Sequence, residues 1–207
     1  MKIYRETIPF QTGHVLEKIQ SLSELNKFYL TGGTALSLLL GHRESEDLDF
    51  FTRESFQPEL LQQKLTMFGA LTSVEISEGT LNAFLSNVKL QFLHYPYELL
   101  EELLQWDNIY IASSLDIACT KLVTISMRGS KKDFIDLYFL LKQFSLPFLF
   151  EKLDEKYRNV QYNKPHILKS LVYFEDAEQQ PTPRMHIPVE WNEVKKTITE
   201  AATTFPL

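Results

Sequence analysis

The chain has 207 residues, 44% of them hydrophobic and 13% aromatic, which is enough to bury a core without disulfides or structural metals. Its formal net charge of −6 excludes a protein that coats DNA, because such binding relies on lysine and arginine side chains that displace counterions. A single cysteine excludes an internal disulfide, and neither a signal sequence nor an apolar run long enough to span a membrane is visible, so we expect a cytoplasmic protein with no membrane contact.

Hydrophobic periodicity and turn residues predict both strands and helices in the first half of the chain. We expect helices near Gly13–Ser23, at Ala35–Leu40 and at Pro58–Phe68. Gly41 is suited to a left-handed C-cap. The expected strands are Lys27–Leu30, Asp47–Phe51, Thr80–Leu85, Val88–His94 and Ile109–Ile111.

The second half reads as helix throughout. We expect helices at Ser114–Met127, Lys131–Phe144, Pro147–Tyr157, Pro165–Phe174 and Pro188–Ala202. Strands come first and helices follow, which predicts an α/β (α+β) unit over residues 1–112 and a helical C-terminal unit over residues 113–207.

Two glycines lie between a predicted strand and a predicted helix, in the sequence Thr31-Gly32-Gly33-Thr34. Glycine backbone at the start of a helix offers N–H groups that can approach a phosphate closely, at the positive end of the helix dipole. Such a pair of glycines also makes an ordinary tight turn, so the pattern leaves both interpretations open.

Asp47 and Asp49 are two residues apart on a predicted strand, so their carboxylates are expected to project from one face. Paired carboxylates suit Mg²⁺, or Mn²⁺ in its place, because magnesium accepts one or two carboxylates and takes its other ligands from water and substrate phosphates. An isolated acid-x-acid pair can equally be a solvated strand edge. Its position just after the glycine loop and helix favours the metal site.

The whole run Tyr29–Phe51, YLTGGTALSLLLGHRESEDLDFF, looks like the first motif of the DNA polymerase β-like nucleotidyltransferases. Within that superfamily it is similar to the AbiEii/AbiGii toxin family. Members carry a glycine loop and then an acid-x-acid strand, separated by a gap similar to the twelve residues between Thr34 and Asp47. The resemblance implies a polymerase β-like mixed sheet with flanking helices.

A second stretch, Ser114–Leu141, resembles the later helical motifs of the same family, in which a lysine and an aspartate assist the metal-binding acids. By this resemblance Lys121 and Arg128 fall at the basic positions, and Asp133 and Asp136 at the acidic ones. Two basic groups could hold the β- and γ-phosphates of a triphosphate. The alternative is a charged seam between helices, for example Lys132 with Asp136.

One departure from the superfamily concerns the third carboxylate, which commonly lies on a later strand. The corresponding run here offers Gln91 or Lys89 instead, and Glu75 or Glu78 are the acids that could substitute. Without a third acid, the site for a second metal and the general base that deprotonates the acceptor are both weakened.

The resemblance implies transfer of a nucleoside monophosphate from a nucleoside triphosphate (NTP) to a hydroxyl acceptor, by a toxin of a bacterial toxin–antitoxin or phage-defence pair. RNA, particularly tRNA, is the expected acceptor and an antitoxin protein the expected partner. The expected catalytic residues are Asp47, Asp49, Lys121 and Asp133. The expected nucleotide-binding residues are Gly32, Gly33, Thr34, Lys121, Arg128 and Asp136.

Two alternatives remain open from the sequence. A module of the same fold could bind a nucleotide or a protein without catalysis, since the third acid is missing. An enzyme that modifies a small molecule such as an aminoglycoside would need an acidic cleft for a cationic acceptor, and the net charge of −6 is compatible with that.

Overall fold

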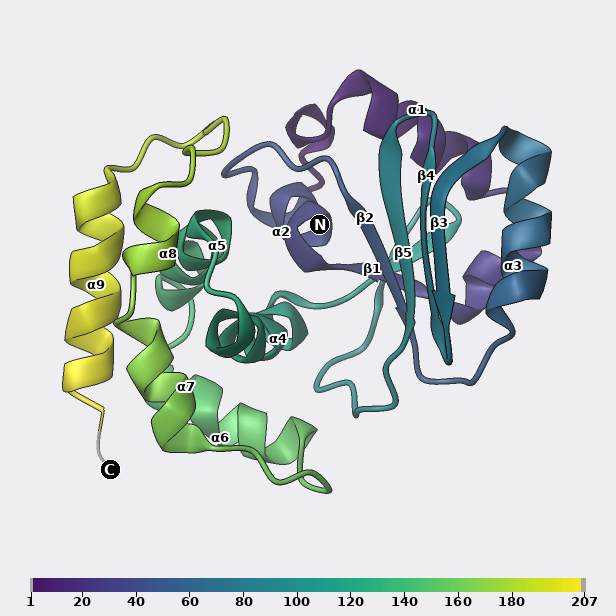
Figure 1. The fold of residues 1–207 in the computed structure, drawn as a ribbon. Helices are drawn as coiled ribbons and strands as arrows, with labels where there is room; N and C mark the ends of the chain where they lie inside the picture. Colours follow the sequence, from purple (N-terminus) through teal and green to yellow (C-terminus); the bar gives the residue numbers. More distant parts are fainter. Residues whose placement is uncertain (1, 206–207) are drawn as a thin grey trace. The chain divides into compact units, whose positions relative to one another are not determined.

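The computed structural model describes residues 2–205, which form two compact units (Figure 1). The sheet unit comprises the chain up to Tyr97 together with Glu102–Ala112. The helical unit comprises Glu98–Glu101 and the chain from Ser113 onward. The chain therefore enters the helical unit briefly before it completes the sheet.

The strands of the sheet unit are β1 Tyr29–Thr31, β2 Leu48–Thr52, β3 Leu71–Ser77, β4 Thr80–Leu85, β5 Val88–His94, β6 Leu104–Trp106 and β7 Ile109–Ile111. Within the described residues they form one seven-stranded sheet in the order β3-β4-β5-β2-β1-β7-β6. Strand β2 is antiparallel to β1 and parallel to β5, and β1 is parallel to β7. The sheet is therefore mixed, as the sequence predicted.

The sheet has an apolar face and a polar face, because strand residues alternate in direction. Phe50 of β2 is buried, whereas its neighbours Asp49 and Phe51 are half-buried. Phe50 is in register with Phe92 of β5, and their rings stack with centroids 5.2 Å apart. The side of the sheet that carries Asp49 is called the polar face below.

The α-helices of the sheet unit are α1 Phe10–Ile19, α2 Gly32–Leu40 and α3 Pro58–Leu65. Short 3-10 segments lie at Arg5–Thr7, Ser23–Lys27 and Thr66–Phe68. Helix α1 contacts β5 and α3 contacts β3 and β4. Both helices bury leucines, and the polar face of these strands is partly exposed. Helices α1 and α3 therefore cover the apolar face of the sheet.

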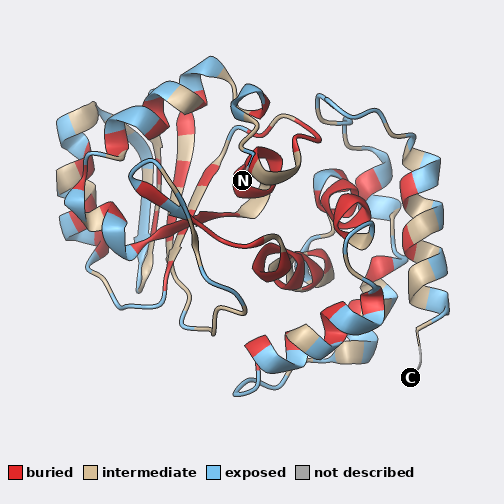
Figure 2. Ribbon diagram, turned by 180° about the vertical axis from the view of Figure 1, so that it is seen from behind, coloured by how far each residue is buried: buried red, intermediate tan, exposed pale blue. Residues whose placement is uncertain are grey.

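The helical unit contains α4 Ser114–Met127, α5 Lys131–Leu141, α6 Leu146–Lys156, α7 Lys164–Leu171, α8 Glu175–Glu178 and α9 Trp191–Thr203. Ser113, Ser145 and Asn163 each accept a backbone N–H of the first turn that follows, which fixes where α4, α6 and α7 begin. Helices α4 and α5 bury most of their residues (Figure 2). They form the centre of the unit, since α4 contacts α5, α6 and α7, and α5 contacts α9.

A buried ion pair attaches the segment Glu98–Glu101 to the helical unit. The Lys156 ammonium lies 2.6 Å from Oδ1 of Asp116 and donates to the carbonyl oxygen of Glu98 at 2.7 Å. The Asp116 carboxylate also accepts two backbone N–H groups of the segment and the Ser113 hydroxyl. These hydrogen bonds compensate for the burial of both charges.

The predicted fold class, a mixed sheet with flanking helices followed by helices, is confirmed. Three strands and one helix have the predicted bounds: Thr80–Leu85, Val88–His94, Ile109–Ile111 and Ser114–Met127. No helix in the described part of the chain combines the length and the hydropathy that crossing a membrane requires.

Other element predictions were wrong in their bounds. The first helix begins at Phe10, directly after Pro9, and ends at Ile19, because a 3-10 turn follows at Ser23–Lys27. The first strand lies at Tyr29–Thr31, two residues later than its predicted start, and the edge strands β3 and β6 were not predicted at all. Strand β2 lies one residue later than predicted, at Leu48–Thr52. Five other helices differ from prediction at their ends: α3 stops at Leu65, α5 at Leu141 and α7 at Leu171, α6 lies one residue earlier at Leu146–Lys156, and α9 starts at Trp191.

Candidate functional site

The glycine pair forms the first turn of α2, so the helix begins at Gly32 rather than at the predicted Ala35. Gly32 has φ 68°, a conformation that side-chain-bearing residues rarely adopt. A Cβ at Gly32 would overlap the carboxylate of Asp49, with its Cγ at 3.1 Å. No side chain caps this end of α2. A carboxylate and the amino end of a helix are thus brought together.

Asp47 and Asp49 are two residues apart at the start of β2. Asp47 directly precedes the strand and follows the exposed Glu46, whereas Asp49 is the second residue of the strand and lies between the buried Leu48 and Phe50; both acids are half-buried. The register places Asp49 opposite Thr31, the last residue of β1, which explains its approach to the adjacent Gly32. The two acids and the glycine turn come from three consecutive elements: β1, α2 and β2.

Thr34 holds the two halves of this site together. Its hydroxyl is fully buried, lies 2.9 Å from the hydroxyl of Ser45 and donates to the backbone carbonyl of Asp47. The threonine side chain therefore fixes the backbone that carries the first acid. Because the Thr34 hydroxyl is buried, it positions Asp47 and does not face solvent.

His42 and Arg43 follow α2 in the chain. The structure buries both, with exposures of 0% and 2%. Arg43 packs against the other glycine, because a Cβ at Gly33 would lie 2.6 Å from its Nη2. Gly33 thus allows the guanidinium to lie beneath the helix start, a role that the sequence did not indicate.

In the helical unit, Lys121 of α4 is paired with both acids of the later motif. Its ammonium lies 2.8 Å from Oδ1 of Asp133 and 2.6 Å from Oδ2 of Asp136, and all three side chains are buried. Asp136 is therefore an ion-pair partner of Lys121. Lys132, the partner that a charged seam suggested, is itself exposed. The two carboxylates fix the position of the lysine.

Asp133 has further partners at the start of α5. It accepts a hydrogen bond from the Ser130 hydroxyl at 2.5 Å and one from Nε of Arg128 at 3.3 Å. Burial alone would raise the pKa of Asp133, but the ammonium of Lys121 and these donors bring that pKa below its ordinary value. The side chain of Arg128 is 62% exposed, so its guanidinium can meet a solvent-borne anion while Nε is held.

The position of the missing third carboxylate is occupied by Gln91. It is the β5 residue in register with Asp49, whereas Lys89 lies two residues before it on the same strand. Glu75, one of the two acids that could have substituted, is in register with Asn82 of β4, which pairs with Gln91. Glu75 is thus three strands from Asp49, roughly 14 Å at the usual strand spacing, too far to share one cation.

The donors near the glycine turn fit a hard divalent cation. The described residues contain no cluster of three or more His, Cys, Asp or Glu side chains arranged for metal. Two carboxylates on one strand face are nevertheless sufficient for Mg²⁺, which keeps waters and substrate phosphates as its other ligands. Oxygen-only donors also exclude a preference for zinc or copper.

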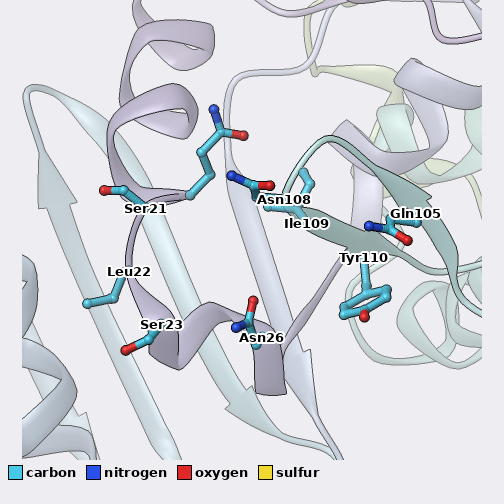
Figure 3. A pocket seen from close by; sticks show the side chains of 9 residues that line it. Ser21, Leu22, Ser23, Asn26, Gln105, Asn108, Ile109 and Tyr110 are labelled. Carbon is cyan, nitrogen blue, oxygen red and sulfur yellow. The ribbon is translucent and has the colours of Figure 1, made fainter.

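A cavity of about 360 Å³ lies elsewhere in the sheet unit (Figure 3). Its lining carries amides, hydroxyls and apolar groups: Gln20, Ser21, Leu22, Ser23, Asn26, Gln105, Asn108, Ile109 and Tyr110. None of these side chains is charged, so the cavity lacks the carboxylates and cations that a metal-bound triphosphate requires. The cavity lies at the start of β7. Asp49 is instead paired with Thr31 at the end of β1. Because β1 and β7 are parallel, the cavity and Asp49 lie toward opposite ends of these strands.

Cys119 is not a nucleophile. It is fully buried in α4, where burial raises the pKa of its thiol to about 12, so the reactive thiolate does not form near neutral pH. Cys119 is a small residue of the core.

Known proteins match this chain in sequence and in fold. A model of the family described as nucleotidyl transferase AbiEii toxin, type IV TA system, matches residues 14–98 and 97–206. The protein aq_aa25 of Aquifex aeolicus (strain VF5) is 42% identical over 171 residues, which cover 80% of this chain and 82% of that protein.

Two solved structures share the fold. MenT4, a nucleotidyltransferase toxin from Mycobacterium tuberculosis H37Rv, aligns with a TM-score of 0.57 and 15% identity over 93% of this chain and 82% of that chain. JHP933 from Helicobacter pylori aligns with a TM-score of 0.53 and 18% identity over 98% and 92%. At such identities the likeness establishes the fold alone. The family model spans nearly the whole chain and includes the glycine turn and both acidic motifs, so this chain belongs to the AbiEii family of nucleotidyltransferase toxins.

Proposed function

We propose that this chain transfers a nucleoside monophosphate from an NTP to a hydroxyl group of RNA, with Asp47 and Asp49 as ligands of Mg²⁺ or Mn²⁺. A tRNA is the preferred acceptor class, and an antitoxin protein is the expected partner in a bacterial toxin–antitoxin pair. The observation that carries the proposal is the contact between the Asp49 carboxylate and Gly32 at the uncapped start of α2.

That contact matters because the two groups bind opposite parts of a metal–triphosphate complex. The carboxylates of Asp47 and Asp49 attract the cation, and the backbone N–H groups of the first turn of α2 attract phosphate oxygens. Thr34 keeps the two in place through its hydrogen bond to the Asp47 carbonyl. When bound, the cation would supply positive charge to the triphosphate as negative charge develops on the leaving group.

In the proposed reaction the acceptor hydroxyl oxygen forms a bond to the α-phosphorus. The bond from that phosphorus to the oxygen bridging to the β-phosphorus breaks, pyrophosphate leaves, and the hydroxyl proton passes to water. The proposal assigns the phosphate-binding cations to the helical unit, namely Lys121, oriented by Asp133 and Asp136, and Arg128. No residue is assigned as general base, because Gln91 cannot accept a proton at neutral pH.

The test is transfer of label from each α-labelled NTP to total RNA, with Mg²⁺ or Mn²⁺ present. We expect label in a tRNA-sized band with the unaltered chain and a loss of at least roughly a hundredfold with Asp49→Asn. Glu75→Gln is the matched control, since it removes a carboxylate from the same face of the sheet three strands away. It should leave transfer unchanged.

The alternative of a non-catalytic module draws support from one observation, the amide at the place of the third acid. That alternative predicts nucleotide binding without transfer to RNA. Absence of labelled product with every nucleotide and both metals, while nucleotide binding persists, would reject the transferase proposal in favour of this one.

A further inference from the structure

A row of polar side chains crosses the polar face of the sheet from Asp49. In register, Asp49 of β2 is beside Gln91 of β5, Gln91 is beside Asn82 of β4, and Asn82 is beside Glu75 of β3. Residues in register on adjacent strands project to the same side, about 5 Å apart. Gln91 is therefore the immediate neighbour of the second metal-binding acid.

The amide of Gln91 is oriented by Asn82. Its Nε2 donates to Oδ1 of Asn82 at 3.0 Å. Strand β4, which carries Asn82, lies on one side of β5, and β2, which carries Asp49, lies on the other. Because the nitrogen and oxygen of a primary amide diverge from one carbon, a donor directed at β4 turns Oε1 away from β4.

We propose that Oε1 of Gln91 is a third, neutral oxygen ligand of the cation at Asp47 and Asp49, and that Asn82 holds it in the ligating orientation. This inference rests on the proposed metal site. Amide carbonyl oxygens are suitable ligands for Mg²⁺ and Mn²⁺. Two carboxylates and one neutral oxygen carry two negative charges, which balance a single divalent cation. The site therefore takes one cation per chain before nucleotide arrives.

The competing explanation is that Gln91 and Asn82 form an ordinary cross-strand pair that only stabilises the sheet. The two explanations differ in what they predict for metal affinity. A structural pair would change the melting temperature without changing metal binding, whereas a ligand would change metal binding in a direction set by its charge.

The test is Mn²⁺ binding to the full chain by calorimetry and by electron paramagnetic resonance, without nucleotide. We expect one Mn²⁺ per chain, about tenfold weaker binding in Gln91→Leu, and tighter binding in Gln91→Glu, which adds a third negative charge. Asn82→Ala should weaken binding by a smaller factor, since the amide remains but is no longer oriented. Glu75→Gln is the control at the far end of the row and should bind as the unaltered chain does.

The outcomes separate this inference from the proposed function. Loss of Mn²⁺ binding in Asp49→Asn together with unchanged affinity in all Gln91 and Asn82 variants would overturn the role of Gln91 and leave the proposed function standing. Failure of the unaltered chain to bind Mn²⁺ would overturn both. Should Gln91→Leu not fold, the metal affinities of Gln91→Glu and Asn82→Ala still test the inference. The first variant keeps a polar side chain and the second introduces a small one, both at half-buried positions.

Discussion

At the scale of single residues, Gly32 is constrained by its own backbone and by Asp49. A φ of 68° disfavours every residue with a side chain, and any Cβ would overlap the Asp49 carboxylate. We expect Gly32→Ala to lower the free energy of unfolding by about 1–2 kcal/mol through the backbone alone. It should also weaken Mn²⁺ binding by displacing Asp49. Urea unfolding and metal titration measure the two effects.

Gly79 provides a matched control for that substitution. It has nearly the same φ, 65°, but lies in the turn between β3 and β4, where a Cβ would meet His94 rather than an acid. Gly79→Ala should therefore lose comparable stability and keep its metal affinity. Equal losses of metal affinity in both variants would show that the effect of Gly32→Ala does not come from displacing Asp49.

At the scale of elements, the ion pairs between α4 and α5 should contribute to stability as well as orienting Lys121. Removing one partner of a buried pair leaves the other charge uncompensated, at a cost of about 3–5 kcal/mol. Because Asp136 still pairs with Lys121, we expect Asp133→Asn to lower the free energy of unfolding at pH 7 by less, about 1–3 kcal/mol, the usual cost of losing hydrogen bonds to a buried charged group. Asp154→Asn, which breaks an exposed pair with Lys164, should cost about 1 kcal/mol or less.

The same pair predicts a pH dependence with a definite sign. The pKa of Asp133 is lowered by folding, so its contribution to stability is fully present above the ordinary aspartate pKa of about 3.9 and is lost as the pH falls through the lowered pKa. Urea unfolding at several pH values measures the free energy of unfolding of the unaltered chain and of Asp133→Asn. The difference between these two free energies should narrow below about pH 4. A difference in the free energy of unfolding that stays constant below about pH 4 would contradict the lowered pKa of Asp133.

Local patterns predicted some elements and the two different faces of β2, where buried and half-buried residues alternate, because alternation along a strand is a property of the strand itself. Strand β3 was missed since Ser73 has φ 48° and a bulge interrupts the register between Thr72 and Glu75, which destroys the period of two. The pairing of Asp49 with Gln91 depends on the register of strands about forty residues apart in the chain, and nothing local in the sequence encodes that register.

Long-range packing also decided the surroundings of the glycine turn. Sequence spacing gave no reason to bury Arg43, and its contact with Gly33 follows from how the loop after α2 returns beneath the helix start. The double pairing of Lys121 was partly foreseeable, because the two aspartates are three apart on one helix and so face one way. Which lysine they face was set by the packing of α4 against α5.

At the scale of the whole molecule, net charge determines how an RNA acceptor can be held. The chain has 21 lysines and arginines against 27 aspartates and glutamates. Affinity for single-stranded nucleic acid falls with salt by a logarithmic slope of about −0.7 per phosphate contact. With only about two such contacts, raising the salt from about 50 to 200 mM should weaken RNA binding by roughly sevenfold, whereas six to ten contacts on a duplex would lose about a thousandfold or more.

We expect the KM for RNA in the transfer reaction to rise by less than about tenfold between about 50 and 200 mM salt, measured at saturating nucleotide and fixed Mg²⁺. A rise of about a thousandfold would instead require an extended basic surface, which this acidic composition does not predict.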